Sequence, residues 1–589
     1  MKILLIDRPV DRRLVLEDDV EFFGPWAQPI DSPEDLSRQN FEPYPSPETV
    51  CKTSVKAVSA AEDIVATMSK IMPPLTGVNM GPRFWRLYLG HYVIRLTGIV
   101  EDIETRRMAL PDDDYIIGVP ESNYIDERIP KSWQDADDML IGDDHFRWHA
   151  MVLYLKNYYS EFQSVNYEKT PLEKLTTTFE DYSIKILNKG RLFLGALTSV
   201  GTKITEKSPS LIWETHHTEG PGLKRVKADF LQFVSIKSFN GIRVDKKKRE
   251  ELSANLPHPY GELVRRSLPL IALEGLPHLI RSLKEKTGLN NFNSVKRVYT
   301  HGQAFTNEAS KRAFLSILAD EGKEIISIQH GGGATYLAHS VMFLERKIAD
   351  KYICWGPGYY DAADGQDSHS IQHLPSIYLS NLKEKKKSAA SGNKKKRWDT
   401  LFVILEENRH IKWIYNPLFP DLAYNYFRRE KTLFDYFCVD TKSAIKVYSI
   451  GYGWGQYDWI KEKYPKVTLL KSGRFVDYAR HAELVIIDYN STGFLEMLAI
   501  GKPILATWNR RWFTGNKRFE EYIDRLKDVN VFFEEPDALI EEYENVISTD
   551  VNKWWNEKKR QDVVTEMAQN FALTADNVYE EWNREFERL

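Results

Sequence analysis

The chain has 589 residues, of which 42% are hydrophobic, 12% aromatic and 28% charged. This composition excludes disordered, collagen-like and coiled-coil proteins, and the length predicts roughly two to four folded domains. The 80 basic and 84 acidic side chains give a formal charge of -4. The protein as a whole therefore has no field that would attract nucleic acid or an anionic membrane.

Cysteine usage and the N-terminus bear on the compartment. The cysteines Cys51, Cys354 and Cys438 are scattered and form no Cys-x-x-Cys pair, which argues against a disulfide framework or a zinc cluster. The first apolar run ends at Ile6, which is too short for a signal peptide and predicts a strand. No segment reaches the roughly 18 consecutive apolar residues that span a bilayer. We expect a cytoplasmic protein with at most peripheral contact at the inner face of the membrane.

Residues 11–290 predict a large helical elaboration of the first domain. After the first strand, proline-rich loops at 25–47 lead to an aromatic-rich helix at 83–91, and a second helix is expected at 146–159. No repeat with a period of 20–50 residues is present.

The next stretch predicts a βαβ unit. Short β-like runs at 295–300, 324–329 and 351–355 end in small or polar residues, and a helix at 307–320 separates the first two. The composition changes at 383–397, where a lysine-rich run has almost nothing to bury. We expect an interdomain linker there. A basic run of this kind could attract an anionic leaflet, but it is more often only a solvated loop.

A second alternation of strands and helices follows the linker. Its strands are expected at 401–405, 444–450, 467–470, 484–487, 503–506 and 531–533, with a helix at 493–500 and an amphipathic helix at 563–586. Runs such as 484–487 are continuously apolar, as strands buried on both faces of a parallel sheet are. The predicted fold class is α/β, with two Rossmann-like domains. Their bounds are 1–382 and 399–560, joined by a linker at 383–398 and followed by a C-terminal helix at 561–589.

The strongest motif is Ser327–Gly333, in which a predicted strand ends at Gln329-His330 and three glycines follow. Gly331 and Gly332 let the backbone approach a ligand and present amide hydrogens to an anion. His330 would stand at the carboxyl end of the strand, where its near-neutral pKa suits a general base or a donor to a phosphate. The alternative is a glycine-rich turn in which the histidine only caps the strand.

The preceding strand ends in Thr300-His301, and the next helix begins near Glu308. Adjacent parallel strands open their carboxyl ends to the same side, so His301 and His330 are expected to converge, with Glu308 completing an acid/base set. A structural histidine and a first-turn helix acid explain the same residues. Metal ligation is less attractive because no paired histidines or carboxylate cluster lie beside these positions.

A second strand-loop-helix junction runs from Ile487 to Glu496. Asn490, Ser491 and Thr492 supply small donors at a helix N-terminus, where free amides and the helix dipole favour a phosphate. Glu496 lies one turn into the helix and suits ribose hydroxyls. An ordinary N-cap with a first-turn acid is the alternative.

Weaker candidates follow other strands of the second half. Arg409 suits a pyrophosphate or carboxylate, the glycines and aromatics at 449–455 suit a nucleobase, and Ser472 lies in a similar loop at 471–474. Strand-to-helix loops are commonly polar and glycine-containing, so each signal alone is weak.

Several of these motifs resemble one family. The segments 329–332, 348–356 and 488–496, together with 85–91 and 143–149, resemble putative transferases encoded with bacterial surface-polysaccharide genes of the O-antigen and capsule type. The resemblance implies a GT-B fold, in which two Rossmann-like domains face each other across a donor/acceptor cleft.

A more distant resemblance is to CDP-glycerol glycerophosphotransferases and Kdo transferases. In the former, one region carries a base histidine, matching His330, and another grips the donor phosphate, matching the loop at 489–492. Glycines follow His330 where a Thr-Pro pair is expected, and Asn490 with Thr492 alters the serine-rich loop. Glycerol-phosphate chemistry is therefore in doubt, whereas a nucleotide donor, such as a CMP-activated acidic sugar, remains implied.

The expected function is a glycosyltransferase that moves a sugar from a nucleotide donor to a surface polysaccharide or its lipid-linked precursor. The donor is a substrate, and neither a metal nor a cofactor is expected. The alternatives are a glycerol- or ribitol-phosphate transferase, a non-catalytic nucleotide-sugar-binding scaffold subunit and, less favoured, a sugar-nucleotide epimerase.

Overall fold

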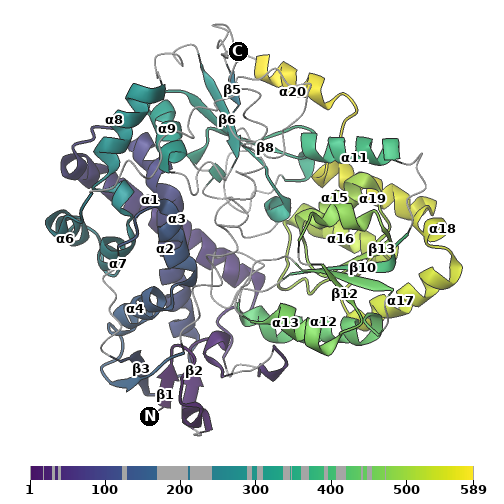
Figure 1. Ribbon diagram of the computed structural model, residues 1–589, viewed down its shortest axis with the longest axis horizontal. Helices are drawn as coiled ribbons and strands as arrows, with labels where there is room; N and C mark the ends of the chain where they lie inside the picture. The colour runs from purple at the N-terminus through teal and green to yellow at the C-terminus, as the bar shows by residue number, and fades with distance from the viewer. Residues whose placement is uncertain are drawn as a thin grey trace.

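The computed structural model describes residues 2–587 except 17–18, 30–32, 38–40, 122–128, 169–209, 213–241, 288–294, 302–308, 336–344, 347, 360–370, 390–395, 406–419, 440–441, 448–453 and 471. Within these residues the chain forms three sheets whose strands all pair in parallel. Helices from distant parts of the chain lie around them (Figure 1). The α/β class predicted from the sequence is confirmed.

The N-terminal sheet was not predicted. It has the order β2-β1-β3-β4, with β1 (Lys2–Leu5), β2 (Val20–Phe22), β3 (Tyr115–Pro120) and β4 (Phe162–Val165). The predicted first strand therefore belongs to a small separate sheet, whose other three strands lie inside the stretch expected to be a helical elaboration.

Two helices were expected in this region, of which that at 83–91 is longer than predicted and that at 146–159 is shorter. The described part of the region contains seven α-helices. They are α1 (Pro47–Thr76), α2 (Pro82–Ala109), α3 (Trp133–Gly142), α4 (Asp144–Leu155), α6 (Lys246–Ala254), α7 (Tyr260–Ser267) and α8 (Leu276–Thr287). Ser46 caps α1 by accepting the Thr49 N–H, and Gly77 ends it in the left-handed conformation. Helix α2 is buried on most of its surface because α1, α4 and α9 (Ala309–Asp320) all pack on it.

The central sheet contains the predicted βαβ unit. Its order is β5-β6-β7-β8-β9, with β5 (Ser210–Ile212), β6 (Arg297–His301), β7 (Glu324–Ile328), β8 (Lys351–Cys354) and β9 (Ile371–His373). The strands expected at 295–300, 324–329 and 351–355 correspond to β6, β7 and β8, and α9 joins the first two.

The C-terminal sheet has the order β12-β11-β10-β13-β14-β15. Its strands are β10 (Trp398–Ile404), β11 (Ser443–Val447), β12 (Thr468–Leu470), β13 (Ala482–Ile487), β14 (Ile504–Thr507) and β15 (Phe532–Phe533), so all six predicted strands are present. Numbered along the chain, this order is 3-2-1-4-5-6, which characterises the Rossmann fold. Ligands of such sheets bind beyond the carboxyl ends of the strands where the order reverses, here between β10 and β13.

Helices surround this sheet and continue from the central one. They are α11 (Ile377–Ala389), α12 (Ala423–Phe437), α13 (Gln456–Lys463), α14 (Phe475–Ala479), α15 (Thr492–Ile500), α16 (Lys517–Asp528), α17 (Pro536–Thr549) and α18 (Val551–Trp555). Helix α11 continues to Ala389, so the first part of the segment expected to be a linker is helical.

The C-terminal segment consists of two helices, α19 (Lys558–Phe571) and α20 (Val578–Glu587), so the prediction of one helix over 563–586 was wrong. The chain leaves the helix at Leu573, whose N–H donates to Trp355 O and whose carbonyl accepts the Ser376 N–H. Helix α20 then returns to the central sheet (Figure 1), where Val578, Trp582 and Phe586 share an apolar cluster with strands β6, β7 and β8.

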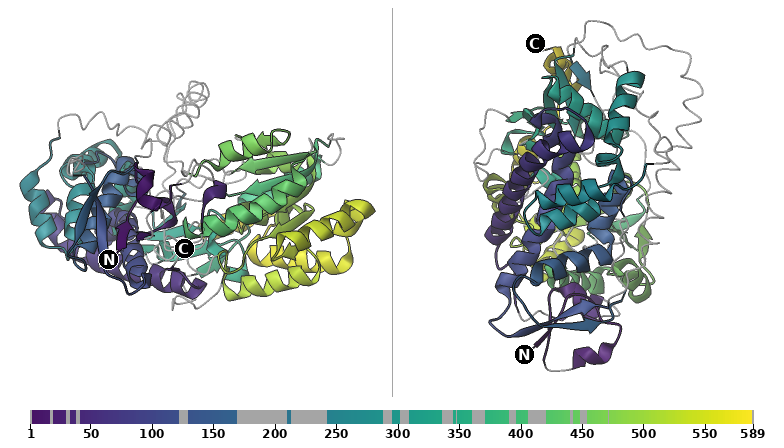
Figure 2. Two further views of the ribbon diagram at one scale, coloured as in Figure 1. Left: turned by 90° about the horizontal axis from the view of Figure 1, so that it is seen from below. Right: turned by 90° about the vertical axis from the view of Figure 1, so that its left-hand side faces the viewer.

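The proline-rich N-terminal segment lies between the N-terminal sheet and the C-terminal domain (Figure 2). It contains the short 3-10 helices η2 (Pro25–Ala27) and η3 (Pro33–Asp35), which pack on η14 (Pro420–Leu422) and α12 respectively. No helix in the described ranges combines the length and the apolar character needed to cross a bilayer.

Beside this segment, Arg106 connects α2 to η14, at the start of α12. Its guanidinium donates to both carboxylate oxygens of Asp421 and, through Nε, to Asp102 Oδ1 at 2.9 Å. The Arg106 side chain is 0% exposed and lies over the Trp26 ring. A buried pair of this kind is costly to break because the partner charges remain buried.

We predict that Arg106→Ala lowers the free energy of unfolding by about 3–5 kcal/mol, because Asp102 and Asp421 lose their buried cation. The measurement is urea denaturation of the full chain. Arg13→Ala is the control, since Arg13 makes a comparable but exposed pair with Asp11 and is expected to unfold like the wild type. Equal denaturation midpoints for Arg106→Ala and Arg13→Ala would contradict the assignment.

Candidate functional site

The two strongest predicted motifs lie in direct contact. The Gly332 N–H, after β7, donates to Thr492 Oγ1 at the start of α15 over 2.8 Å. Asn490, two residues before Thr492, donates from its Nδ2 to Thr335 Oγ1 over 2.9 Å. Loops that follow buried strands of two different sheets therefore meet at one place.

Glycine at position 332 is required by this contact. A Cβ atom there would lie 2.7 Å from both the carbonyl carbon of Ser491 and the backbone nitrogen of Thr492. Both are backbone atoms of a helix start and cannot swing aside. Gly331 has a milder restriction, since its Cβ would meet only the Thr492 hydroxyl at 2.9 Å.

His330 lies directly before this contact and is partly exposed, although its Nδ1 atom is buried. Burial lowers the pKa of His330 to about 4, so the imidazole is neutral at pH 7. The side-chain amide of Gln329 holds the loop in place. It donates to Gly331 O and to the Tyr359 hydroxyl, and it accepts the Trp355 N–H. Tyr359 in turn donates to Phe571 O in α19, so the C-terminal helices support the loop.

Of the two partners predicted for His330, the structure describes the backbone of His301 but not Glu308. His301 ends β6, and its backbone pairs with Ile328, two residues before His330. This register agrees with the expectation that the two strand ends lie side by side. Glu308 and Arg409 lie outside the described residues, as do most of the loop at 449–455 and residue 471.

The polar side chains at the start of α15 form hydrogen bonds within the protein. Ser491 is the N-cap and accepts the Phe494 N–H over 3.2 Å, as the ordinary capping interpretation predicts. Asn490 is fully buried in its bond to Thr335. Ser472, by contrast, is exposed, and its carbonyl accepts the Tyr478 hydroxyl.

Glu496 lies on the buried side of α15 and accepts the Tyr378 hydroxyl of α11 over 2.6 Å. Burial raises the pKa of Glu496 to about 7, against the opposing effects of Tyr378 and Arg474. The carboxyl is therefore close to half-ionised at neutral pH. A ribose hydroxyl that binds it would take the place of the Tyr378 hydroxyl or join it.

A polar group that sequence reasoning missed occupies the edge between β10 and β13. The Tyr426 hydroxyl of α12 accepts the Leu405 N–H over 2.8 Å and donates to Asp488 Oδ2 over 2.7 Å. Glu430, one turn along α12, hydrogen-bonds to Asp488 and accepts from Gln456 of α13. Polar residues four apart on an otherwise apolar helix face were the available signal, but their partner lies about 60 residues away.

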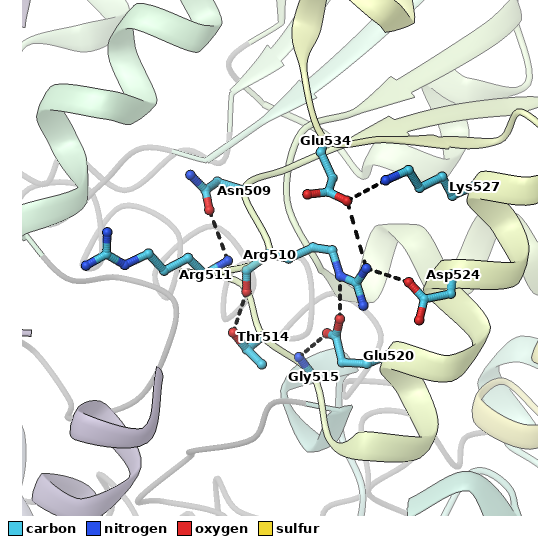
Figure 3. A network of polar contacts seen from close by, with 9 residues as sticks. All are labelled: Asn509, Arg510, Arg511, Thr514, Gly515, Glu520, Asp524, Lys527 and Glu534. Carbon is cyan, nitrogen blue, oxygen red and sulfur yellow. Dashed lines mark hydrogen bonds and ion pairs between the residues drawn. The ribbon is translucent and has the colours of Figure 1, made fainter. Parts of the chain in front are cut away.

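The loop after β14 completes this edge. Arg510 is held by Glu520, Asp524 and Glu534, while Arg511 points away from that network (Figure 3) and donates to Glu42 of the N-terminal segment over 2.6 Å. The Asn516 N–H donates to Thr335 O over 2.7 Å. The loops after β13 and β14 are thus both bonded to Thr335.

Comparisons with known proteins agree with a transferase. A family model described as LIC12162 family transferase matches residues 10–586. The chain is similar to a UDP-GlcNAc 2-epimerase from Neisseria meningitidis bound to UDP-GlcNAc, at 12% identity and TM-score 0.33, over 53% of this chain and 80% of that one.

Two other solved structures are similar at comparable levels. One is a variant of the wall teichoic acid polymerase TagF with CDPG, at 10% identity and TM-score 0.34, over 71% of this chain and 97% of that one. The other is the calicheamicin glycosyltransferase CalG4, at 13% identity and TM-score 0.28, over 65% and 98%. No protein with a curated function matches significantly.

We predict that Gly332→Ala destabilises the protein by about 1–3 kcal/mol, because the added methyl group overlaps the backbone of Ser491 and Thr492. Thr492→Ser is the control, since it keeps the hydroxyl that accepts the Gly332 N–H. Thermal unfolding of both variants checks the contact. If Gly332→Ala melted with the wild type, the two loops would not touch in solution.

Proposed function

Because the chain belongs to the LIC12162 family of transferases, we propose that it transfers a sugar from a nucleotide-activated donor to a surface polysaccharide or its lipid-linked precursor. The observation that carries the proposal is the contact between the His330 loop and the start of α15, beside the β10–β13 edge. A general base and a helix N-terminus able to receive a phosphate then lie at one place.

The donor is assigned to the C-terminal domain. The N-terminus of α15 favours the negative charge of the donor phosphate through the helix dipole, and Glu496 takes the ribose hydroxyls. Ser491, Thr492 and Asn490 shape this helix start, while Arg409 and Ser472 support the donor from neighbouring loops. A CMP-activated acidic sugar is the donor class that we favour.

The chemistry is assigned to His330, assisted by His301 and Glu308. A neutral imidazole accepts the proton of the acceptor hydroxyl as its oxygen bonds to the anomeric carbon and the bond from that carbon to the phosphate oxygen breaks. The leaving nucleotide carries away the bonding electron pair, and the dipole of α15 stabilises its new charge. A pKa of about 4 leaves His330 neutral at physiological pH, but it makes the imidazole a weaker base than one with the near-neutral pKa expected from the sequence.

We predict that His330→Ala lowers turnover by roughly 100- to 10,000-fold, the usual worth of a general base, while donor affinity and the melting temperature change little. His373→Ala is the control, because His373 ends β9 of the same sheet and has no assigned role. The measurement is sugar transfer under saturating donor. Near-normal turnover in His330→Ala would reject the catalytic assignment.

The donor assignment predicts that one nucleotide among CMP, CDP, UDP and GDP raises the melting temperature selectively. A ligand at 100 times its dissociation constant stabilises the folded state by about 2.7 kcal/mol. Glu496→Ala is expected to reduce this shift. Tyr378→Phe is the matched control, because it removes the hydroxyl that now occupies Glu496 and leaves the carboxyl in place.

The outcomes separate the competing functions. An equal shift in Glu496→Ala and wild type would remove Glu496 from the donor site. A new phosphodiester in the product, made with the donor phosphate, would identify a polyol-phosphate transferase. Donor binding without turnover on any acceptor would identify a binding subunit.

A further inference from the structure

The edge between β10 and β13 contains two buried carboxyl groups in contact. Asp488 follows β13 and is 6% exposed, and Glu430 of α12 is 1% exposed. Asp488 Oδ2 accepts a hydrogen bond from the Tyr426 hydroxyl. The buried Oδ1 accepts none from an N–H or O–H group in the part of the chain that the structure describes. Besides the Tyr426 hydroxyl and the Asp488 backbone N–H, the carboxyl of Glu430 hydrogen-bonds to the Asp488 side chain.

Two carboxylates cannot hydrogen-bond to each other, because an ionised carboxylate only accepts. One proton between them converts the repulsion into a charge-assisted hydrogen bond. Among the residues that the structure describes, the other groups around the pair are consistent with one negative charge. Arg429 of α12 faces Asp488 and is itself shared with Thr507, Glu535 and Glu534, while Gln456 donates an amide hydrogen to Glu430.

We propose that Asp488 and Glu430 share one proton, and that this proton holds the β10–β13 edge in the arrangement that binds the nucleotide donor. The second half of this inference rests on the proposed function. Loss of the proton places two negative charges side by side, pushes α12 from the loop that leads into Asn490 and Thr492, and repels the donor phosphates. Asp488 and Glu430 are thus positioning residues that make donor binding depend on pH.

The direction of the pH effect follows from burial. Burial raises the pKa of Asp488 to about 8, and the opposing effects of Tyr426 and Arg429 do not cancel it. In the unfolded chain this carboxyl titrates at its ordinary pKa near 3.8. Between these values the folded state holds a proton that the unfolded state lacks, so the pair's contribution to stability falls as pH rises to about 8 and is constant above it.

The first experiment needs no ligand. Melting temperatures of the full chain are measured from about pH 5 to pH 9 for wild type, Asp488→Asn and Glu430→Gln. An amide N–H supplies the missing donor and does not titrate in this pH range. Both variants are therefore expected to gain stability relative to wild type as pH rises to about 8. Should one variant fail to fold, the other serves the same purpose.

Asp435→Asn is the control on the same helix. Desolvation is outweighed there by Lys431 and Tyr464, which lower the pKa of Asp435, so its removal cannot create a slope at alkaline pH. Parallel pH curves for wild type, Asp488→Asn and Glu430→Gln would overturn the shared proton.

The second experiment measures CMP binding between about pH 7.5 and pH 9.5, where CMP itself does not titrate. Wild-type affinity is expected to fall by up to tenfold per pH unit above about 8, and that of Asp488→Asn to stay level. The same pH profile in both proteins would overturn the link to the donor while leaving the transferase intact. No CMP binding by either protein, with the stability slopes present, would overturn the CMP-donor assignment and not the shared proton.

Discussion

The backbone of Gly332 lies so close to Ser491 and Thr492 that no side chain fits between them. This contact sets the distance between the central and C-terminal sheets, because each loop follows a strand buried in its own sheet. Thr335 extends the contact by accepting from Asn490 and, through its carbonyl, from the Asn516 backbone. The position of His330 relative to α15 is therefore a consequence of backbone packing.

Two further connections hold the sheets in this relation. On one side, α20 returns from the C-terminal domain to cover β6, β7 and β8, and α19 receives the Tyr359 hydroxyl that supports Gln329. On the other, Arg106 binds Asp421, and Arg511 binds Glu42 of the N-terminal segment. The third sheet thus reaches α12, the helix that carries Tyr426 and Glu430, through residues that precede α1. The parts of the site come from distant segments, and no single segment could hold them alone.

Local signals predicted much of this arrangement, and tertiary contacts decided the rest. The apolar runs of β7, β8 and β13 and the glycines after His330 are visible in the sequence. Strand β4 is short and mostly exposed, so it has no strand pattern to detect. The break after α19 contains neither glycine nor proline, and it arises because Leu573 bonds to the central sheet. The roles of Tyr426 and Glu430 could not be predicted from the sequence, because their partner Asp488 reaches them only in the folded chain.

We propose that the donor binds where the C-terminal sheet reverses its strand order, against the His330 loop. Hydrogen exchange of the full chain, with and without the nucleotide that stabilises it, tests this most directly. The account predicts slower exchange in the peptides that contain residues 488–496, the first turns of α12 and residues 329–335, with little change in β1–β4. Protection confined to the N-terminal sheet, or to β6–β9 without the α15 peptide, would contradict it.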